Sequence, residues 1–380
     1  MVESGFWDSG FGIWALGRAQ PDKIARVRRL TIAIVLLAAG LASAQPAPDF
    51  TELRRIATTL PRLHSLVVSH RGEIVFEHYG RGHSATRPAN VKSASKSIIS
   101  ALVGVAIERG LIKSVDQRAA DFFPELAKDQ DPRKRAITVE HLLTMRSGLE
   151  STSGQNYGRW VTSRNWVAHA LARPLVAEPG TTMQYSTGTS HILSALLTRV
   201  TKTSTWQFAN AALGKPLGIQ IARWPQDPQG IYFGGNDMLL TPRQMIALGE
   251  LYLNEGRVKG QQVVPERWVT TSCVPRTSSR FDPGREYGYG WWIDEVGGET
   301  ACYAWGYGGQ FILVFEDLDL VVTATSSTAE SDERRGYRRE LLRLIGEQVV
   351  RPIKSQNPKP KAQSQNPISN PNALSFGLGI

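Results

Sequence analysis

The chain has 380 residues, 41% of them hydrophobic and 21% charged, which suits a globular protein with one large domain or two closely packed ones. Its net charge of +10 lies largely at the ends: residues 1–44 contribute +2 and residues 351–380 contribute +4, which leaves +4 between them. The sequence shows no basic stripe interleaved with aromatic residues, so we expect no nucleic-acid partner.

The first 44 residues are predicted to be an extension followed by a secretory signal peptide. Three arginines at positions 26 to 29 precede an apolar run over residues 30–42, and Ala42-Ser43-Ala44 forms a cleavage site. The run is too short to span a hydrocarbon core of ~30 Å comfortably. We therefore expect a periplasmic or secreted protein with no stable membrane span after cleavage, and an uncleaved membrane anchor is the alternative.

Secondary-structure patterns begin after the leader. Two strand-forming runs flank Arg71-Gly72 within residues 65–79 and predict a β-hairpin. From Ser95, apolar residues recur at helical spacing as far as Gly110, which predicts a helix. A helical subdomain is predicted over about 115–215, and its helical patterns cover residues 139–145, 166–173, 190–200 and 206–213.

The second half of the chain returns to strands after one more helix. That helix is predicted to begin at Thr241, because Thr241 and Gln244 form a capping box around Pro242 in the first turn. Strands are predicted at 287–293, 311–315 and 320–325, followed by a final helix at 332–350. Strands towards both ends of a domain at 47–350, with helices between them, predict an α/β fold.

The C-terminal stretch, the two cysteines and the histidines are also candidate structural or functional features. The polar, Pro-rich stretch 354–380 is predicted to be disordered. Cys273 and Cys302 lack metal-type spacing; they either pair in an oxidising compartment or remain two buried thiols, and we favour the thiols. His141 and His191 are predicted to be structural, and the chain has no H-E-x-x-H, Walker A or G-x-S-x-G motif, so we expect no metal and no cofactor.

Ser93 and Lys96 lie three residues apart where a loop enters the first long helix, so they share one helix face. A serine hydroxyl is a weak nucleophile that needs a base, and a lysine amine can be that base if burial lowers its pKa. The helix N-terminus also disfavours a cation and offers N–H groups to an oxyanion. The alternative is that Ser93 or Ser95 only caps the helix while Lys96 is solvated.

Five segments, at residues 91–110, 137–150, 179–197, 227–257 and 303–315, together resemble the serine β-lactamase and penicillin-binding-protein-like superfamily. They are most similar to the class C β-lactamase-related branch, which includes DD-peptidases, family VIII-type esterases and 6-aminohexanoate-dimer hydrolases. The resemblance covers roughly 50–350. It implies an antiparallel sheet flanked by helices with an inserted all-helical subdomain, and a Ser93 acyl-enzyme formed from a small amide, ester or peptide.

The resemblance also implies a catalytic role for Tyr185, in Tyr185-Ser186-Thr187. A phenol beside a lysine ammonium is pushed toward phenolate and can then move protons between Ser93, the leaving group and water. Relatives often carry Asn at the position of Thr187, whose hydroxyl cannot supply both amide groups. We expect Thr187 to contact substrate.

The segment Ala304-Trp305-Gly306 falls where β-lactamases carry K-T-G. Ala304 has no charge, so we expect no carboxylate anchor there and favour a small amide or ester over a β-lactam or peptidoglycan peptide. Trp305, Gly306 and Gly308 are expected to contact substrate.

The backbone N–H groups of Ser93 and Tyr307 are expected to form the oxyanion hole. Trp160 and Trp166 either face the same pocket or belong to the core. We expect an exported serine hydrolase of amide or ester bonds. The alternatives are a β-lactamase or DD-peptidase, and a non-catalytic penicillin-binding-like protein.

Overall fold

The computed structural model describes residues 48–279, 282, 284–330 and 336–356. The predicted leader lies outside these residues, as do the predicted start of the last helix at Asp332 and the tail from residue 357. Residues 354–356, predicted to be disordered, instead complete helix α14 (Arg351–Gln356). Within the described residues, no helix is long and apolar enough to cross a membrane.

One eight-stranded sheet organises the fold, with the order β2-β1-β12-β11-β10-β9-β8-β7. Its strands are β1 (Leu63–His70), β2 (Glu73–Tyr79), β7 (Thr277–Ser278), β8 (Glu286–Tyr287), β9 (Trp292–Val296), β10 (Glu299–Gly306), β11 (Gln310–Phe315) and β12 (Leu320–Ser326). Every neighbouring pair is antiparallel. The predicted hairpin and the antiparallel sheet are therefore confirmed. Strands from both sequence ends meet where β1 pairs with β12.

The strand predicted at 287–293 is wrong in one respect, because a turn divides it into β8 and β9. Gly290 in this turn has a φ of +78°, and its carbonyl accepts a hydrogen bond of 2.6 Å from Ser97 Oγ. An added Cβ on Gly290 would lie 3.0 Å from the Lys96 carbonyl oxygen, so the turn packs directly on the first long helix. The tertiary contact, which periodicity does not report, breaks the strand.

Helices occupy most of the remaining chain. They are α2 (Thr51–Thr59), α3 (Ser95–Glu108), α4 (Pro124–Ala127), α5 (Val139–Leu143), α6 (Tyr157–Val161), α7 (Trp166–Leu171), α8 (Thr187–Thr201), α9 (Thr205–Ala209), α10 (Lys215–Leu217), α11 (Pro242–Leu253), α12 (Glu266–Ser272), α13 (Tyr337–Ile345) and α14. The capping box predicted at Thr241 is present, with Gln244 N–H donating to Thr241 Oγ1 at 3.2 Å. The short pairs β3 (Ala89–Asn90) with β4 (Leu239–Leu240) and β5 (Arg257–Val258) with β6 (Gln261–Gln262) complete the elements.

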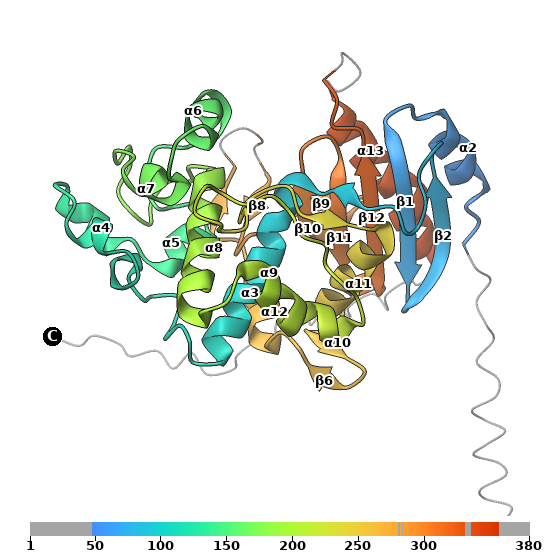
Figure 1. Ribbon diagram of the computed structural model, residues 1–380. Coiled ribbons are helices and arrows are strands. Elements are labelled where there is room, and N and C mark those ends of the chain that lie inside the picture. Colours follow the sequence, from blue (N-terminus) through green and yellow to red (C-terminus); the bar gives the residue numbers. More distant parts are fainter. Residues whose placement is uncertain (1–47, 280–281, 283, 331–335, 357–380) are drawn as a thin grey trace, which may run out of the picture. The chain divides into compact units, whose positions relative to one another are not determined.

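Both faces of the sheet are covered by helices (Figure 1). On β11, Phe311, Leu313 and Phe315 pack into the core with α2 and α13, whereas Ile312 and Val314 pack into the core with α3 and α11. This alternation follows from the two-residue period of a strand that is buried on both sides. The expected sheet flanked by helices is confirmed.

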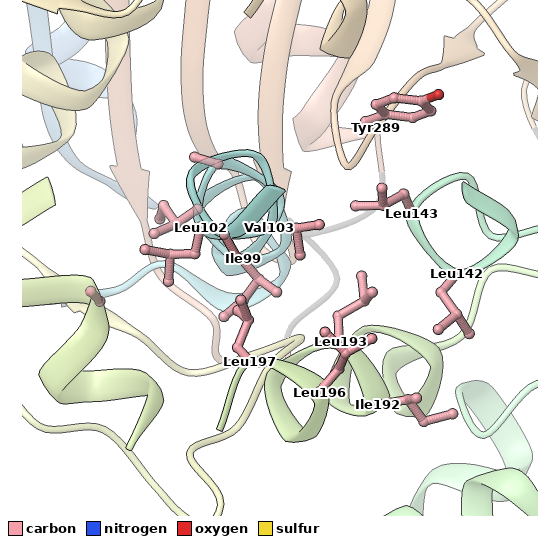
Figure 2. Close-up of a cluster of buried hydrophobic side chains, with 14 of the residues drawn as sticks. Ile99, Leu102, Val103, Leu142, Leu143, Ile192, Leu193, Leu196, Leu197 and Tyr289 are labelled. Atoms are coloured by element: carbon pink, nitrogen blue, oxygen red, sulfur yellow. The ribbon is translucent and has the colours of Figure 1, made fainter. Parts of the chain in front are cut away.

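The longest buried helices meet beside the sheet. Figure 2 shows Ile99 and Leu102 of α3 near Leu196 and Leu197 of α8, with Leu143 of α5 beside them. All five side chains are at most 1% exposed. Such close packing fixes the N-terminal turn of α3 relative to the residues that precede α8.

Cys273 and Cys302 form a disulfide with a Cα–Cα distance of 5.7 Å. The expectation of two buried thiols is therefore wrong, because pairing depends on a distance that only the fold sets. The bond joins the end of α12 to β10, four residues before Gly306. It anchors the strand that reaches the candidate active site.

Candidate active site

Ser93 lies in a tight turn, Lys92–Ala94, that leads directly into α3. Lys92 has a φ of +50°, and its N–H donates to Asn90 Oδ1 at 2.9 Å. Asp237 accepts hydrogen bonds from Asn90 Nδ2 at 2.8 Å and from Lys92 Nζ at 3.0 Å. Ser95 Oγ donates to the Lys92 carbonyl at 2.6 Å, which closes the turn on its other side. These contacts hold the backbone of Ser93 in one position.

Lys96 is buried beneath Ser93, with an exposed fraction of 3%. Its Nζ lies 3.0 Å from Ser93 Oγ and donates to the Gly235 carbonyl at 2.5 Å. Burial lowers the pKa of Lys96 to about 7, and the nearby Asp237 carboxylate opposes this shift. The solvated lysine of the alternative interpretation is excluded, and the amine can take a proton from Ser93 near neutral pH.

Gly235 is held against α8 by a buried hydrogen-bonded pair, His191 and Asp227. His191 Nε2 lies 3.0 Å from Asp227 Oδ2, and His191 Nδ1 accepts the N–H of Gly234 at 3.3 Å. A Cβ on Gly235 would lie only 2.8 Å from the Thr187 carbonyl oxygen, so glycine is needed for this close approach. His191 is structural, as predicted, and it supports the carbonyl that binds Lys96.

Tyr185 lies just before α8 and faces Lys96. Lys96 Nζ is 5.0 Å from the centroid of the Tyr185 ring, and that ring stacks on Trp292 at 5.7 Å. Burial raises the pKa of Tyr185 to about 12, and the neighbouring Ser93 hydroxyl and Arg285 charge only reduce the shift. The phenolate expected from the sequence is therefore wrong, because burial shifts both Lys96 and Tyr185 toward their neutral forms and Tyr185 remains a phenol.

Thr187 does not reach the pocket in the way expected from the sequence. It is 5% exposed, its N–H donates to Ser153 Oγ at 2.9 Å, and the two hydroxyl oxygens are 3.0 Å apart. Ser153 lines the cavity beside Tyr185. The structure thus makes Thr187 a support for Ser153, because the backbone of α8 turns its side chain inward.

Gly306 ends β10 against the turn that carries Ser93. An added Cβ would lie 2.1 Å from the Val91 carbonyl oxygen, and one on Gly308, whose φ is +88°, would lie 2.7 Å from the Ser327 carbonyl oxygen. The close approach that requires these glycines is therefore to backbone, and their contact with substrate remains a prediction. The packing of Gly306 brings Tyr307, the next residue, beside the Ser93 turn.

A cavity of about 430 Å³ opens beside Tyr185. Trp292 of β9 and Trp305 of β10 form an aromatic wall, with Met183 and Arg285 alongside them. Trp305 lines the cavity as predicted. Ala304, its neighbour on β10, is fully buried in the core and contributes no charge.

Trp160 and Trp166 belong to the core and do not line this cavity. Trp160 is fully buried, its ring lies 5.2 Å from that of Trp166, and its Nε1 donates to the Trp166 carbonyl at 2.9 Å. Both rings also pack on Phe233. The core interpretation of the two is confirmed.

The sequence survey missed Gly235, Asp237, Trp292 and Arg285. Gly235 lies 139 positions from Lys96 along the chain, so no local spacing connects them. The one available signal was the cluster of aromatic residues that follows Arg285 in REYGYGWW. In the described part of the chain, no group of three or more His, Cys, Asp or Glu residues is placed to bind a metal.

Comparison with known proteins agrees with this geometry. Residues 62–347 match the family model described as Beta-lactamase. A 6-aminohexanoate-dimer hydrolase from Paenarthrobacter ureafaciens is 24% identical over 334 residues, which covers 77% of this chain and 82% of that protein.

Solved structures show the same fold. A penicillin-binding protein homologue from Caulobacter crescentus has a TM-score of 0.63 and 18% identity, over 80% of this chain and 98% of that one. EstCE1, a hydrolase with promiscuous acyltransferase activity, has a TM-score of 0.61 and 18% identity, over 77% and 97%.

Because the family model covers most of the chain, the protein belongs to the Beta-lactamase family. Within that family it is a serine hydrolase of the β-lactamase fold. The family includes enzymes with different substrates, so membership does not select among a β-lactam, an amide and an ester.

Proposed function

We propose that this hydrolase cleaves a small amide or ester through an acyl-enzyme on Ser93. The observation that carries the proposal is the Lys96 amine, which is buried 3.0 Å from Ser93 Oγ and has a pKa of about 7. An amine with this pKa is a competent general base at neutral pH, and its position fits removal of the hydroxyl proton.

The proposed reaction has two halves. Ser93 Oγ attacks the substrate carbonyl carbon while Lys96 takes its proton, and the carbonyl oxygen becomes an oxyanion held by the N–H groups of Ser93 and Tyr307. The carbon–heteroatom bond then breaks, and the leaving group gains the proton from Lys96 through the phenol of Tyr185. Water next attacks the acyl carbon, gives a proton to Lys96, and releases the acid as Ser93 regains its hydrogen.

Two observations favour a small amide or ester. The relatives include a 6-aminohexanoate-dimer hydrolase and EstCE1. Ala304, where the related β-lactamases carry the lysine of K-T-G, is uncharged and fully buried. The family model and the penicillin-binding protein homologue from Caulobacter crescentus keep a β-lactamase and a DD-peptidase as alternatives, and the uncharged Ala304 is the observation that ranks them lower.

We propose export to the periplasm or beyond the cell on two grounds. The first is the leader that ends at Ala44. The second is the Cys273–Cys302 disulfide, since such bonds persist in oxidising compartments. N-terminal sequencing of mature protein from a native-type host should begin at Gln45, and a chain that retains residues 1–44 would reject the proposal.

Covalent labelling tests the acyl-enzyme mechanism. A fluorophosphonate probe should add once to wild-type protein, on the peptide that contains Ser93, and should not add to Ser93→Ala. Exposed Ser84 offers a matched control, and Ser84→Ala should label like the wild type. Equal labelling of Ser93→Ala would reject the proposal.

A further inference from the structure

The cavity beside Tyr185 has a cationic wall. Arg285, the residue before β8, lines the cavity and is 6% exposed. Its guanidinium carbon lies 4.0 Å from the ring centroid of Trp292 and 5.2 Å from that of Trp305. Cation–π contacts of this kind hold the guanidinium in place.

The donors of Arg285 are poorly satisfied. Its Nε and Nη1 atoms are buried and have no hydrogen-bond partner in the part of the chain that the structure describes. Among those residues its one ion pair is with Asp282, at 3.8 Å from Nε, which is beyond hydrogen-bond distance. The same Asp282 oxygen accepts a hydrogen bond from Arg338 Nη2. One carboxylate oxygen thus serves two guanidinium groups.

Asp294 of β9 is the other acid near this cluster. Burial raises the pKa of its carboxyl, while the charges of Arg285 and Arg338 oppose that shift. Within the described residues it forms an ion pair with neither arginine. A buried guanidinium with no carboxylate within hydrogen-bond distance among the described residues is unfavourable, and an anion that contacts Arg285 where it lines the cavity would relieve this cost.

We propose that Arg285 binds a carboxylate of the substrate, so that the enzyme prefers esters or amides with a carboxylate a short chain away from the scissile carbonyl. The inference rests on the proposed function, because the cavity adjoins Tyr185. A volume of about 430 Å³ suits such a small molecule, and Trp292, Trp305 and Met183 offer apolar walls to its methylene groups. The anchor comes from the β7–β8 connection, on a different wall from Ala304.

Matched substrates test this proposal. The mono-p-nitrophenyl ester of glutaric acid is compared with p-nitrophenyl valerate for an acyl-side carboxylate. For a leaving-group carboxylate, p-carboxyphenyl valerate is compared with p-carbamoylphenyl valerate. In at least one pair the wild type should prefer the charged ester by about tenfold or more in kcat/KM, as a charge-assisted hydrogen bond predicts.

Variants then connect the preference to the residue. In Arg285→Gln the charged-to-neutral ratio should fall close to one, whatever the absolute rates. Arg285→Lys keeps the positive charge but loses the planar pair of N–H donors. In this variant the charged-to-neutral ratio should lie between those of the wild type and Arg285→Gln. Arg343→Gln is the matched control, because Arg343 is exposed on α13 and should keep the wild-type ratio.

A wild-type ratio near one in both pairs, or an unchanged ratio in Arg285→Gln, would overturn the proposal. If Arg285→Gln does not fold, an unchanged charged-to-neutral ratio in Arg285→Lys would also overturn the proposal. Failure of the proposed function looks different: no ester, charged or neutral, would then be hydrolysed in a manner that depends on Ser93.

Discussion

The Ser93 turn and the cavity wall of Arg285 are built differently, although the proposed mechanism has both contact one substrate. The turn is tied by hydrogen bonds to Asp237 and Ser95, and Lys96 just after it donates to the Gly235 carbonyl. The wall consists of Trp292 and Trp305 around a guanidinium whose Nε and Nη1 lack hydrogen-bond partners in the described chain. Hydrogen bonds that are formed before substrate binds suit a nucleophile, because they fix its position. N–H groups without a partner suit a surface that binds a ligand. Changes in the turn should therefore slow all substrates alike, and changes in the wall should alter which substrate is preferred.

The largest effect is expected at the nucleophile. Ser93→Ala and Lys96→Met should each lower kcat by at least about a thousandfold for every ester tested, because the two groups act as one unit. Steady-state kinetics on both charged and neutral esters measures this. Lys128→Ala, at an exposed lysine, should behave like the wild type. A loss confined to one class of ester would contradict the separation of turn and wall.

Gly306→Ala should be next in size. Its methyl group would clash with the Val91 carbonyl oxygen at 2.1 Å and push Tyr307 away from the Ser93 turn. We expect kcat to fall about a hundredfold, the usual consequence of displacing a catalytic group by about 1 Å. Gly158→Ala is the control, since an added Cβ there meets no atom within 4 Å. Equal rates for both variants would show that β10 does not position the site.

The pH profile gives a smaller and graded effect. Burial lowers the pKa of Lys96 to about 7, so the neutral base predominates above that pH and is lost below it. We expect kcat/KM to fall about tenfold for each pH unit below 7. Asp237→Asn should move this acidic decline of kcat/KM to lower pH, because the aspartate raises the pKa of Lys96. If kcat/KM declines at the same pH in Asp237→Asn as in the wild type, Lys96 is not the titrating base.

The disulfide should affect stability more than rate. Cys273 and Cys302 are 29 residues apart, and closing such a loop typically contributes about 2–4 kcal/mol. Reduction should lower Tm by several degrees. The Cys273→Ala/Cys302→Ala double variant should already have the lower Tm and not respond to reductant, as the chain has no other cysteine. An unchanged Tm after verified reduction would show that the bond carries no stability.

What the sequence predicts well is local. The Ser93–Lys96 spacing, the Thr241 capping box and the 65–79 hairpin each depend on residues within a few positions, and the structure reproduces all three contacts. Resemblance to a known family added Tyr185 to the predicted catalytic residues. In the structure, the centroid of the Tyr185 ring lies 5.0 Å from Lys96 Nζ.

What the sequence did not predict depends on segments far apart in the chain. The carbonyl of Gly235 binds Lys96, the Cys273–Cys302 disulfide joins the end of α12 to β10, and Arg285 lines the cavity from the β7–β8 connection. The pKa of Tyr185 was misjudged for a similar reason, because burial outweighs the Ser93 hydrogen bond and the Arg285 charge. Burial is a property of the whole fold.

Trapping the acyl-enzyme would show directly whether Ser93 is the nucleophile. Wild-type protein is mixed with an excess of p-nitrophenyl ester, denatured in acid during turnover, digested, and analysed by mass spectrometry. We expect an acyl mass on the peptide that contains Ser93. Turnover with no acyl mass on Ser93, or with the acyl mass on another residue, would contradict it.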